Sequence, residues 1–165
     1  MNSGFRIEIV GPDSWARVRA IRLDALSANP EAFGATHESE SEIPESQWRD
    51  RLTSLNFVIA ADASGDVGIM SVETHEGDFG TTCWIGGCWV RPDARGNGVM
   101  RALIDFIDQQ SETRPWGCQG LGVWTDNYSA ISTYKRLGFL EKGDPQESTR
   151  QPGKFYQRMI RTTQQ

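Results

Sequence analysis

The stretch Val-Arg-Pro-Asp-Ala-Arg-Gly-Asn-Gly-Val-Met-Arg-Ala-Leu-Ile, residues 90–104, decides the fold of this chain. An apolar run that ends at Val90 predicts a strand, and an amphipathic run that starts at Gly98 predicts a helix. The polar loop between them carries Arg95 and Gly96. The first N–H groups of a helix have no partner within it, and the helix dipole favours negative charge there. This loop therefore predicts a site for a phosphate group.

Length and composition predict one domain over residues 1–165. Apolar residues make up 38% and charged residues 24%, as in an ordinary globular protein. The net charge is −5 and no basic stripe is visible, which argues against a nucleic-acid partner. No apolar run has the length of a membrane span, and the first residues lack the apolar core of a signal peptide. We expect a cytoplasmic protein without a membrane partner.

The three cysteines, Cys83, Cys88 and Cys118, predict neither a disulfide framework nor a metal site. Their number is odd, and the step from Cys83 to Cys88 is no usual zinc spacing. His37 and His75 are isolated in the sequence. We therefore expect small buried apolar cysteines and no bound metal.

The apolar periodicity predicts an α+β fold. Seven strands are expected over 5–10, 57–61, 67–74, 81–90, 120–125, 139–142 and 155–161. Four helices are expected over 12–27, 44–55, 98–113 and 127–137. Short connections make most neighbours antiparallel, whereas the helix before 120–125 makes this strand parallel to 81–90. The prediction is a mixed, mostly antiparallel sheet of about seven strands flanked by about four helices.

Residues 29–43 form a long polar segment with Phe33 as its expected apolar anchor. Such a connection is either a flap over a ligand or a solvated loop. The adjacent pair Gly86-Gly87 lies inside an expected strand and indicates a bulge or a bend.

The last expected helix places Asn127, Ala130, Tyr134 and Leu137 on one face, at spacings of three and four residues. By itself this pattern also fits an ordinary packed helix whose tyrosine hydroxyl finds a backbone partner.

Together the two motifs resemble the GNAT superfamily of acyl-CoA-dependent N-acetyltransferases. The loop Val90-x-Pro92-x-x-Arg95-Gly96-Asn97-Gly98-Val99-Met100 is similar to the pyrophosphate loop of that family. The helix motif is Asn127-x-x-Ala130-x-x-x-Tyr134-x-x-x-Gly138-Phe139, which matches the second family motif. The order of elements fits along the whole chain.

The resemblance implies acetyl-CoA as the acyl donor and splayed central strands. The pyrophosphate would lie on the amides of Arg95, Gly96, Asn97, Gly98, Val99 and Met100. The pantetheine arm would follow Trp89 and Val90 and lie near Asn127. Tyr134 would be the general acid that protonates the departing thiolate, because its ordinary pKa of about 10 suits an alkyl thiol.

Two departures from the family pattern stand out. Met100 occupies a position where Gly or Ala is usual, so it either crowds the diphosphate or turns into the core. The expected strand 81–90 contains no carboxylate, which leaves the general base open. The candidates are Glu73, Glu38, Glu40, Asp126 and a water chain.

The leading prediction is an enzyme that moves an acetyl group from acetyl-CoA to a primary amine on a small molecule. The alternatives are acetylation of a protein N-terminus or lysine, and a non-catalytic domain that binds acyl-CoA as a sensor. A homodimer is compatible with the resemblance, but no motif decides it.

Overall fold

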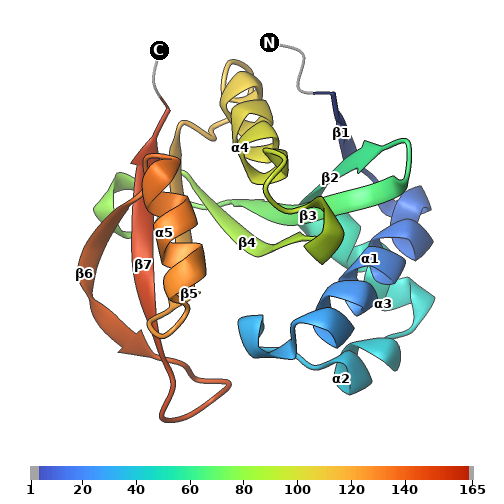
Figure 1. Ribbon diagram of the computed structural model, residues 1–165, viewed down its shortest axis with the longest axis horizontal. Coiled ribbons are helices and arrows are strands. Elements are labelled where there is room, and N and C mark those ends of the chain that lie inside the picture. Colours follow the sequence, from blue (N-terminus) through green and yellow to red (C-terminus); the bar gives the residue numbers. More distant parts are fainter. Residues whose placement is uncertain (1–3, 164–165) are drawn as a thin grey trace. The chain divides into compact units, whose positions relative to one another are not determined.

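The computed structural model describes residues 4–163, which form two compact units. The first unit contains the chain up to residue 73 together with 87–106, and the second contains 74–86 and the chain from 107 onward. The strands are β1 (Arg6–Val10), β2 (Asn56–Asp62), β3 (Gly65–Thr74), β4 (Cys83–Val90), β5 (Cys118–Trp124), β6 (Leu140–Glu147) and β7 (Phe155–Thr162) (Figure 1). The α-helices are α1 (Trp15–Ala28), α2 (His37–Ser41), α3 (Glu45–Ser54), α4 (Val99–Gln110) and α5 (Tyr128–Arg136).

The strands hydrogen-bond in the order β1-β2-β3-β4-β5-β7-β6. Strands β1 to β3 are antiparallel, β5 is parallel to β4, and β7 is antiparallel to both β5 and β6. The prediction of an α+β fold with a mixed seven-stranded sheet is confirmed. Among residues 4–163 there are five α-helices rather than the expected four, because the short α2 forms within the predicted loop.

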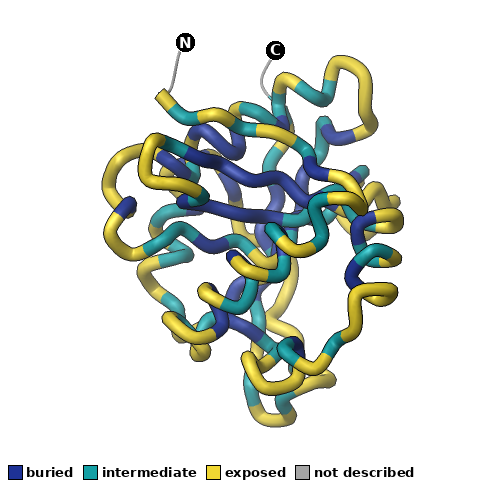
Figure 2. The backbone as a smooth tube through the Cα atoms, turned by 90° about the vertical axis from the view of Figure 1, so that its right-hand side faces the viewer, coloured by how far each residue is buried: buried dark blue, intermediate teal, exposed yellow. Residues whose placement is uncertain are grey.

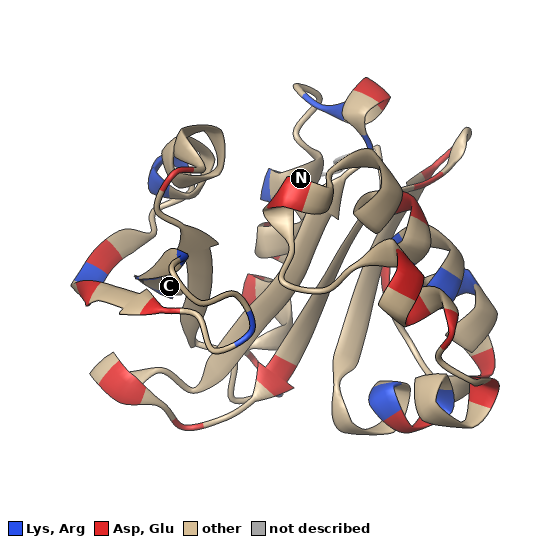
Figure 3. Cartoon of the chain, turned by 90° about the horizontal axis from the view of Figure 1, so that it is seen from below, with Lys and Arg blue, Asp and Glu red and all other residues tan. Residues whose placement is uncertain are grey.

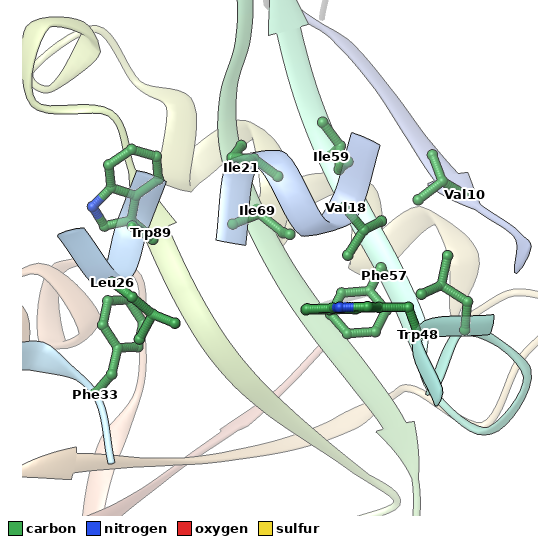
Figure 4. Close-up of a cluster of buried hydrophobic side chains, with 12 residues drawn as sticks. Val10, Val18, Ile21, Leu26, Phe33, Trp48, Phe57, Ile59, Ile69 and Trp89 are labelled. Carbon is green, nitrogen blue, oxygen red and sulfur yellow. The ribbon is translucent and has the colours of Figure 1, made fainter. Parts of the chain in front are cut away.

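In the first unit the core lies between the strands and the helices α1 and α3. Figure 4 shows Val18 and Ile21 of α1 and Trp48 of α3 over the side chains of β2 and β3. Strand β2 is buried along almost its whole length, which explains its continuous apolar run (Figure 2). The indole of Trp48, which is fully buried, lies in this cluster together with the indole of Trp89.

Close packing in this unit also fixes where α4 begins. A Cβ added at Gly68 of β3 would lie 2.8 Å from Cγ1 of Val99, the first residue of α4. Only a glycine allows this approach, so the sheet and the start of α4 are held together at Gly68.

In the second unit the ladder between β4 and β5 is short. It pairs Cys83 with Gln119, Trp84 with Gly120 and Ile85 with Leu121, and it ends there although both strands continue. The ladder therefore ends where Gly86-Gly87 predicted an irregularity.

Most boundaries shift by one to three residues, and two segments differ from the prediction by more, for local physical reasons. The segment 29–43 is partly helical, because Pro30 starts a 3-10 turn and Thr36 caps α2 by accepting a hydrogen bond from the Ser39 amide at 3.1 Å. Strand β6 runs five residues beyond its expected end at Lys142, to Glu147, because its ladder with β7 shifts register and then resumes. All of β6 is exposed, which explains the weak apolar pattern of this strand.

Candidate functional site

The predicted phosphate loop follows a single 3-10 turn, Pro92–Ala94, and ends at the start of α4. Gly96 and Gly98 have φ angles of +82° and +81°, a region that other residues avoid. A Cβ at either position would meet no atom within 4 Å, so the backbone conformation, and not lack of space, requires glycine. Within residues 4–163, the amides of Gly96, Asn97 and Gly98 donate to no protein acceptor. The loop therefore presents N–H groups and open space, which suits a bound diphosphate.

The side chains of the loop hold its shape. Arg95 donates from Nε to the carbonyl of Val90 at 2.9 Å and from Nη2 to Oδ1 of Asn29 at 2.8 Å. The indole of Trp89 donates to the same Oδ1 at 2.9 Å. The side chain of Asn97 turns back onto the carbonyl of Ala94 at 3.0 Å.

Asn29, at the end of α1, is a site residue that sequence reasoning missed. It accepts hydrogen bonds from both Trp89 and Arg95, which lie 60 and 66 positions further along the chain. No local pattern signals such a contact, since the partners meet only in the folded unit.

The side chains of two predicted coenzyme residues, Trp89 and Val99, are buried in the protein. Trp89 is only 5% exposed and lies in the core near Leu26 (Figure 4). Val99 is buried against Gly68, and Met100 is half-buried. Any contact of Trp89 or Val99 with a ligand would therefore go through the main chain. Whether Met100 crowds the diphosphate stays a prediction.

The second motif lies on α5, in the second unit. Asn127 is the N-cap of α5, and its Oδ1 accepts a hydrogen bond from the Ala130 amide at 3.2 Å. Tyr134 is buried, and its ring meets Phe139 edge-on with 5.8 Å between the centroids. Gly138 ends the helix at a φ of +102°, as its position predicted. The motif therefore builds and anchors this helix.

The loop and the tyrosine belong to different units, and the meeting of the two motifs at one reaction centre stays a prediction. The first unit brings Asn29, Trp89 and Arg95 together. In the second unit, Asn127 caps the start of α5 and Tyr134 lies within the same helix.

Of the candidate bases, Glu40 differs from the others. It is only 4% exposed and accepts hydrogen bonds from Arg22 on both carboxylate oxygens. Glu73, Glu38 and Asp126 are exposed, as surface carboxylates ordinarily are. Glu40 is therefore part of a buried ion pair, whereas the other three carboxylates face solvent. Which of the candidates acts as the base stays a prediction.

The cysteines are free thiols, and burial raises the pKa of Cys83 to about 12. Among residues 4–163, no group of three or more His, Cys, Asp or Glu side chains is placed to hold a metal ion. No helix in that range is long and apolar enough to cross a membrane. Figure 3 shows acidic and basic positions intermixed along the helices of the first unit.

A profile of the "Acetyltransferase (GNAT) family" matches residues 18–139, well over half of the chain and both motifs. The chain belongs to the GNAT acetyltransferase family. The sequence-based family prediction is thereby confirmed.

Curated relatives of this GNAT protein include two mycothiol acetyltransferases. The one from Mycobacterium sp. (strain MCS) is 29% identical over 134 residues, which is 78% of this chain and 43% of the relative. The one from Arthrobacter sp. (strain FB24) is 30% identical over 148 residues, which is 84% of this chain and 42% of the relative. The chain therefore spans less than half the length of these proteins.

Solved structures show the same fold at low sequence identity. A GNAT acetyltransferase from Streptococcus pneumoniae superposes with a TM-score of 0.76 at 14% identity, covering 97% of this chain and 99% of the other. Spermidine N-acetyltransferase from Vibrio cholerae, solved with CoA and spermine, gives 0.73 at 17% identity, with 98% and 97% covered.

Proposed function

We propose that this GNAT protein transfers an acetyl group from acetyl-CoA to a primary amine on a small molecule. The observation that carries the proposal is the loop after β4, whose two left-handed glycines turn unpaired amides toward open space at the start of α4. Two kinds of relative support a small-molecule acceptor, since one is named a mycothiol acetyltransferase and the other a spermidine N-acetyltransferase.

Acetyl-CoA would be held mainly by main-chain groups. The diphosphate would accept hydrogen bonds from the amides of residues 95–100, and the α4 dipole would add favourable charge. The pantetheine arm would pair with the main chain at Trp89 and Val90, as an added strand does. Asn127 would lie beside the thioester end.

In the proposed reaction, the amine nitrogen attacks the thioester carbonyl carbon, and a C–N bond forms. A strand amide that stabilises the resulting oxyanion contributes about 3 kcal/mol. The C–S bond then breaks, and the hydroxyl of Tyr134 donates its proton to the departing sulfur. The proton of the attacking amine leaves to a water chain or to an exposed carboxylate such as Glu73.

The test of this function is release of coenzyme A thiol from acetyl-CoA over a panel of small amines, with a peptide carrying a free N-terminus and lysine as a separate arm. Turnover with small amines supports the proposal. Turnover with the peptide alone, or coenzyme binding without any turnover, overturns it in favour of a protein acetyltransferase or an acyl-CoA sensor.

Tyr134→Phe tests the proposed acid. We expect kcat to fall well over tenfold while the affinity for acetyl-CoA, measured by calorimetry, stays within about twofold, because only the hydroxyl is lost. Tyr128→Phe is the matched control, since Tyr128 begins the same helix and is 77% exposed. Normal turnover in Tyr134→Phe would show that Tyr134 is not the general acid.

A further inference from the structure

A buried carboxylate in the first unit is surrounded by arginines from two helices. Glu40 of α2 accepts from Nε and Nη2 of Arg22 at 3.0 and 3.1 Å. Nη1 of Arg51 on α3 lies 3.5 Å from the same carboxylate. Glu40 is only 4% exposed and the side chain of Arg22 is 15% exposed, so the charges of this pair are poorly hydrated.

The guanidinium of Arg22 is held rigidly. Glu40 binds one edge of it with two parallel hydrogen bonds, and the ring of the buried Phe33 lies against it with 4.9 Å between Cζ and the ring centroid. The side chain of Arg22 is 15% exposed. Its other edge ends in Nη1, which donates to no acceptor among residues 4–163. The structure thus fixes a guanidinium and leaves both N–H groups of Nη1 unused.

That unused donor faces the irregular part of β4. A Cβ added at Gly87 would lie 3.0 Å from Nη1 of Arg22, so the absence of a side chain at Gly87 keeps the space beside Nη1 open. Gly87 is exposed and has a φ of +58°, a conformation that favours glycine. The donor and an accessible stretch of backbone therefore share one place.

The charges in this cluster do not cancel. Glu40 carries one negative charge, whereas Arg22 and Arg51 carry one positive charge each, so the hydrogen-bonded group has an excess of one positive charge. A pair that served packing alone would need only one arginine. An excess positive charge near a rigid, unused N–H donor favours an anionic ligand.

We propose that Nη1 of Arg22 binds a carboxylate of the acceptor, so that the acceptor is an amine that also carries a carboxylate, such as an amino acid. The proposal rests on the proposed acetyl transfer. Gly87 lies two residues before Trp89 on the same strand, about 7 Å along it, so a ligand at Gly87 is one small molecule away from the proposed pantetheine path. The same charge disfavours polyamines, which would place a cation beside Arg22.

The experiment compares each amino acid with its own carboxamide, with spermidine and tyramine as amines that lack a carboxylate. The measured quantity is the ratio of kcat/KM for the acid to kcat/KM for the amide, in the wild type and in variants. Comparing the ratio between proteins cancels the different basicity of the two amines. We expect the wild type to prefer the acid.

The decisive variant is the double substitution Arg22→Gln with Glu40→Gln, which replaces the ion pair by two amides and leaves no buried charge unpaired. We expect the acid-to-amide ratio to fall about 10- to 100-fold, because a charged hydrogen bond to the carboxylate is lost, while activity on the amide is retained. Arg22→Lys should recover part of the ratio. Arg51→Gln removes the excess charge but leaves Nη1 of Arg22 in place, so it should lower the ratio by much less than the double substitution does.

Two outcomes would overturn the inference: a wild type that acetylates spermidine or tyramine in preference to every amino acid, or an acid-to-amide ratio unchanged in the double variant. Either result leaves the acetyltransferase function standing. Absence of thiol release with all amines would instead contradict the proposed function. An equal loss of activity on acid and amide would show that Arg22 only supports the fold, and this also overturns the inference.

Discussion

Glu40 in the first unit and Asp108 in the second are each bound by an arginine on both carboxylate oxygens, and these two pairs differ in what they leave unused. In the second unit, Arg161 of β7 donates to Asp108 of α4 at 2.6 and 2.8 Å. Its Nε donates to the carbonyl of Leu137 at 2.8 Å, and Nη1 also reaches Gln119 at 3.2 Å. Gln119 and Thr163 donate to Asp108 in turn. Every nitrogen of this guanidinium is used within the protein.

In the first unit, by contrast, the pair of Arg22 and Glu40 uses two nitrogens and leaves Nη1 beside Gly87. A saturated network joins elements, here the end of α5 and the strand β7 through Leu137 and Arg161. A network with an unused donor can still form a hydrogen bond to a ligand. The comparison therefore separates a pair that holds the fold from a pair suited to recognition.

The largest effect is expected from breaking the saturated pair. Asp108→Ala leaves the guanidinium of Arg161, whose side chain is 12% exposed, without its charged partner. The free energy of unfolding should fall by about 3 kcal/mol, as it does when one member of a buried pair is removed. Urea denaturation measures this, and the acid-to-amide preference of the folded fraction should not change.

The control for this substitution removes both charges together. Asp108→Leu with Arg161→Met should restore much of the lost stability, because no buried charge is left unpaired. If the free energy of unfolding falls as much in the double variant as in Asp108→Ala, the unpaired charge of Arg161 is not the cause of the loss.

A smaller effect is expected from acid. Burial by itself would raise the pKa of Asp108, but hydrogen bonds from Arg161 and Gln119 outweigh it and lower this pKa below its ordinary value. The stabilisation is therefore complete above the unfolded-state pKa of about 4 and is lost as the pH falls through the lower folded-state pKa. Unfolding curves between pH 2 and 7 should show the stability gap between wild type and Asp108→Asn closing below about pH 4. A gap that is constant over this range would contradict the pKa direction.

The smallest effect should come from Arg51→Gln in the unsaturated cluster. Arg51 is 37% exposed and lies 3.5 Å from Glu40, so the pair is partly hydrated. We expect a loss of less than about 1 kcal/mol in thermal unfolding. A loss as large as that of Asp108→Ala would mean that the arginine excess around Glu40 holds the fold, and the contrast between the two pairs would fail.

Much of the fold could be read from local patterns. The strands, the four long helices and the helix end at Gly138 follow from apolar periodicity and from the conformations that only glycine adopts easily. These properties depend on neighbouring residues, so the sequence carries them directly. The family followed from two such motifs at their separation in the chain.

What only the tertiary structure decided is the pairing of polar side chains. Glu40 was one of several acidic candidates for the base, and its local sequence did not indicate that it is buried against Arg22, which is eighteen positions away. Asn29 joins Arg95 from sixty-six positions away, and Asp108 joins Arg161 from fifty-three. Charged residues have no periodicity that reports their partners, and a hydrogen bond depends on atoms meeting within about 3 Å. The sequence by itself determined the elements and the glycine-containing loop before α4, whereas the packing of those elements decided which polar side chains are satisfied within the protein and which are not.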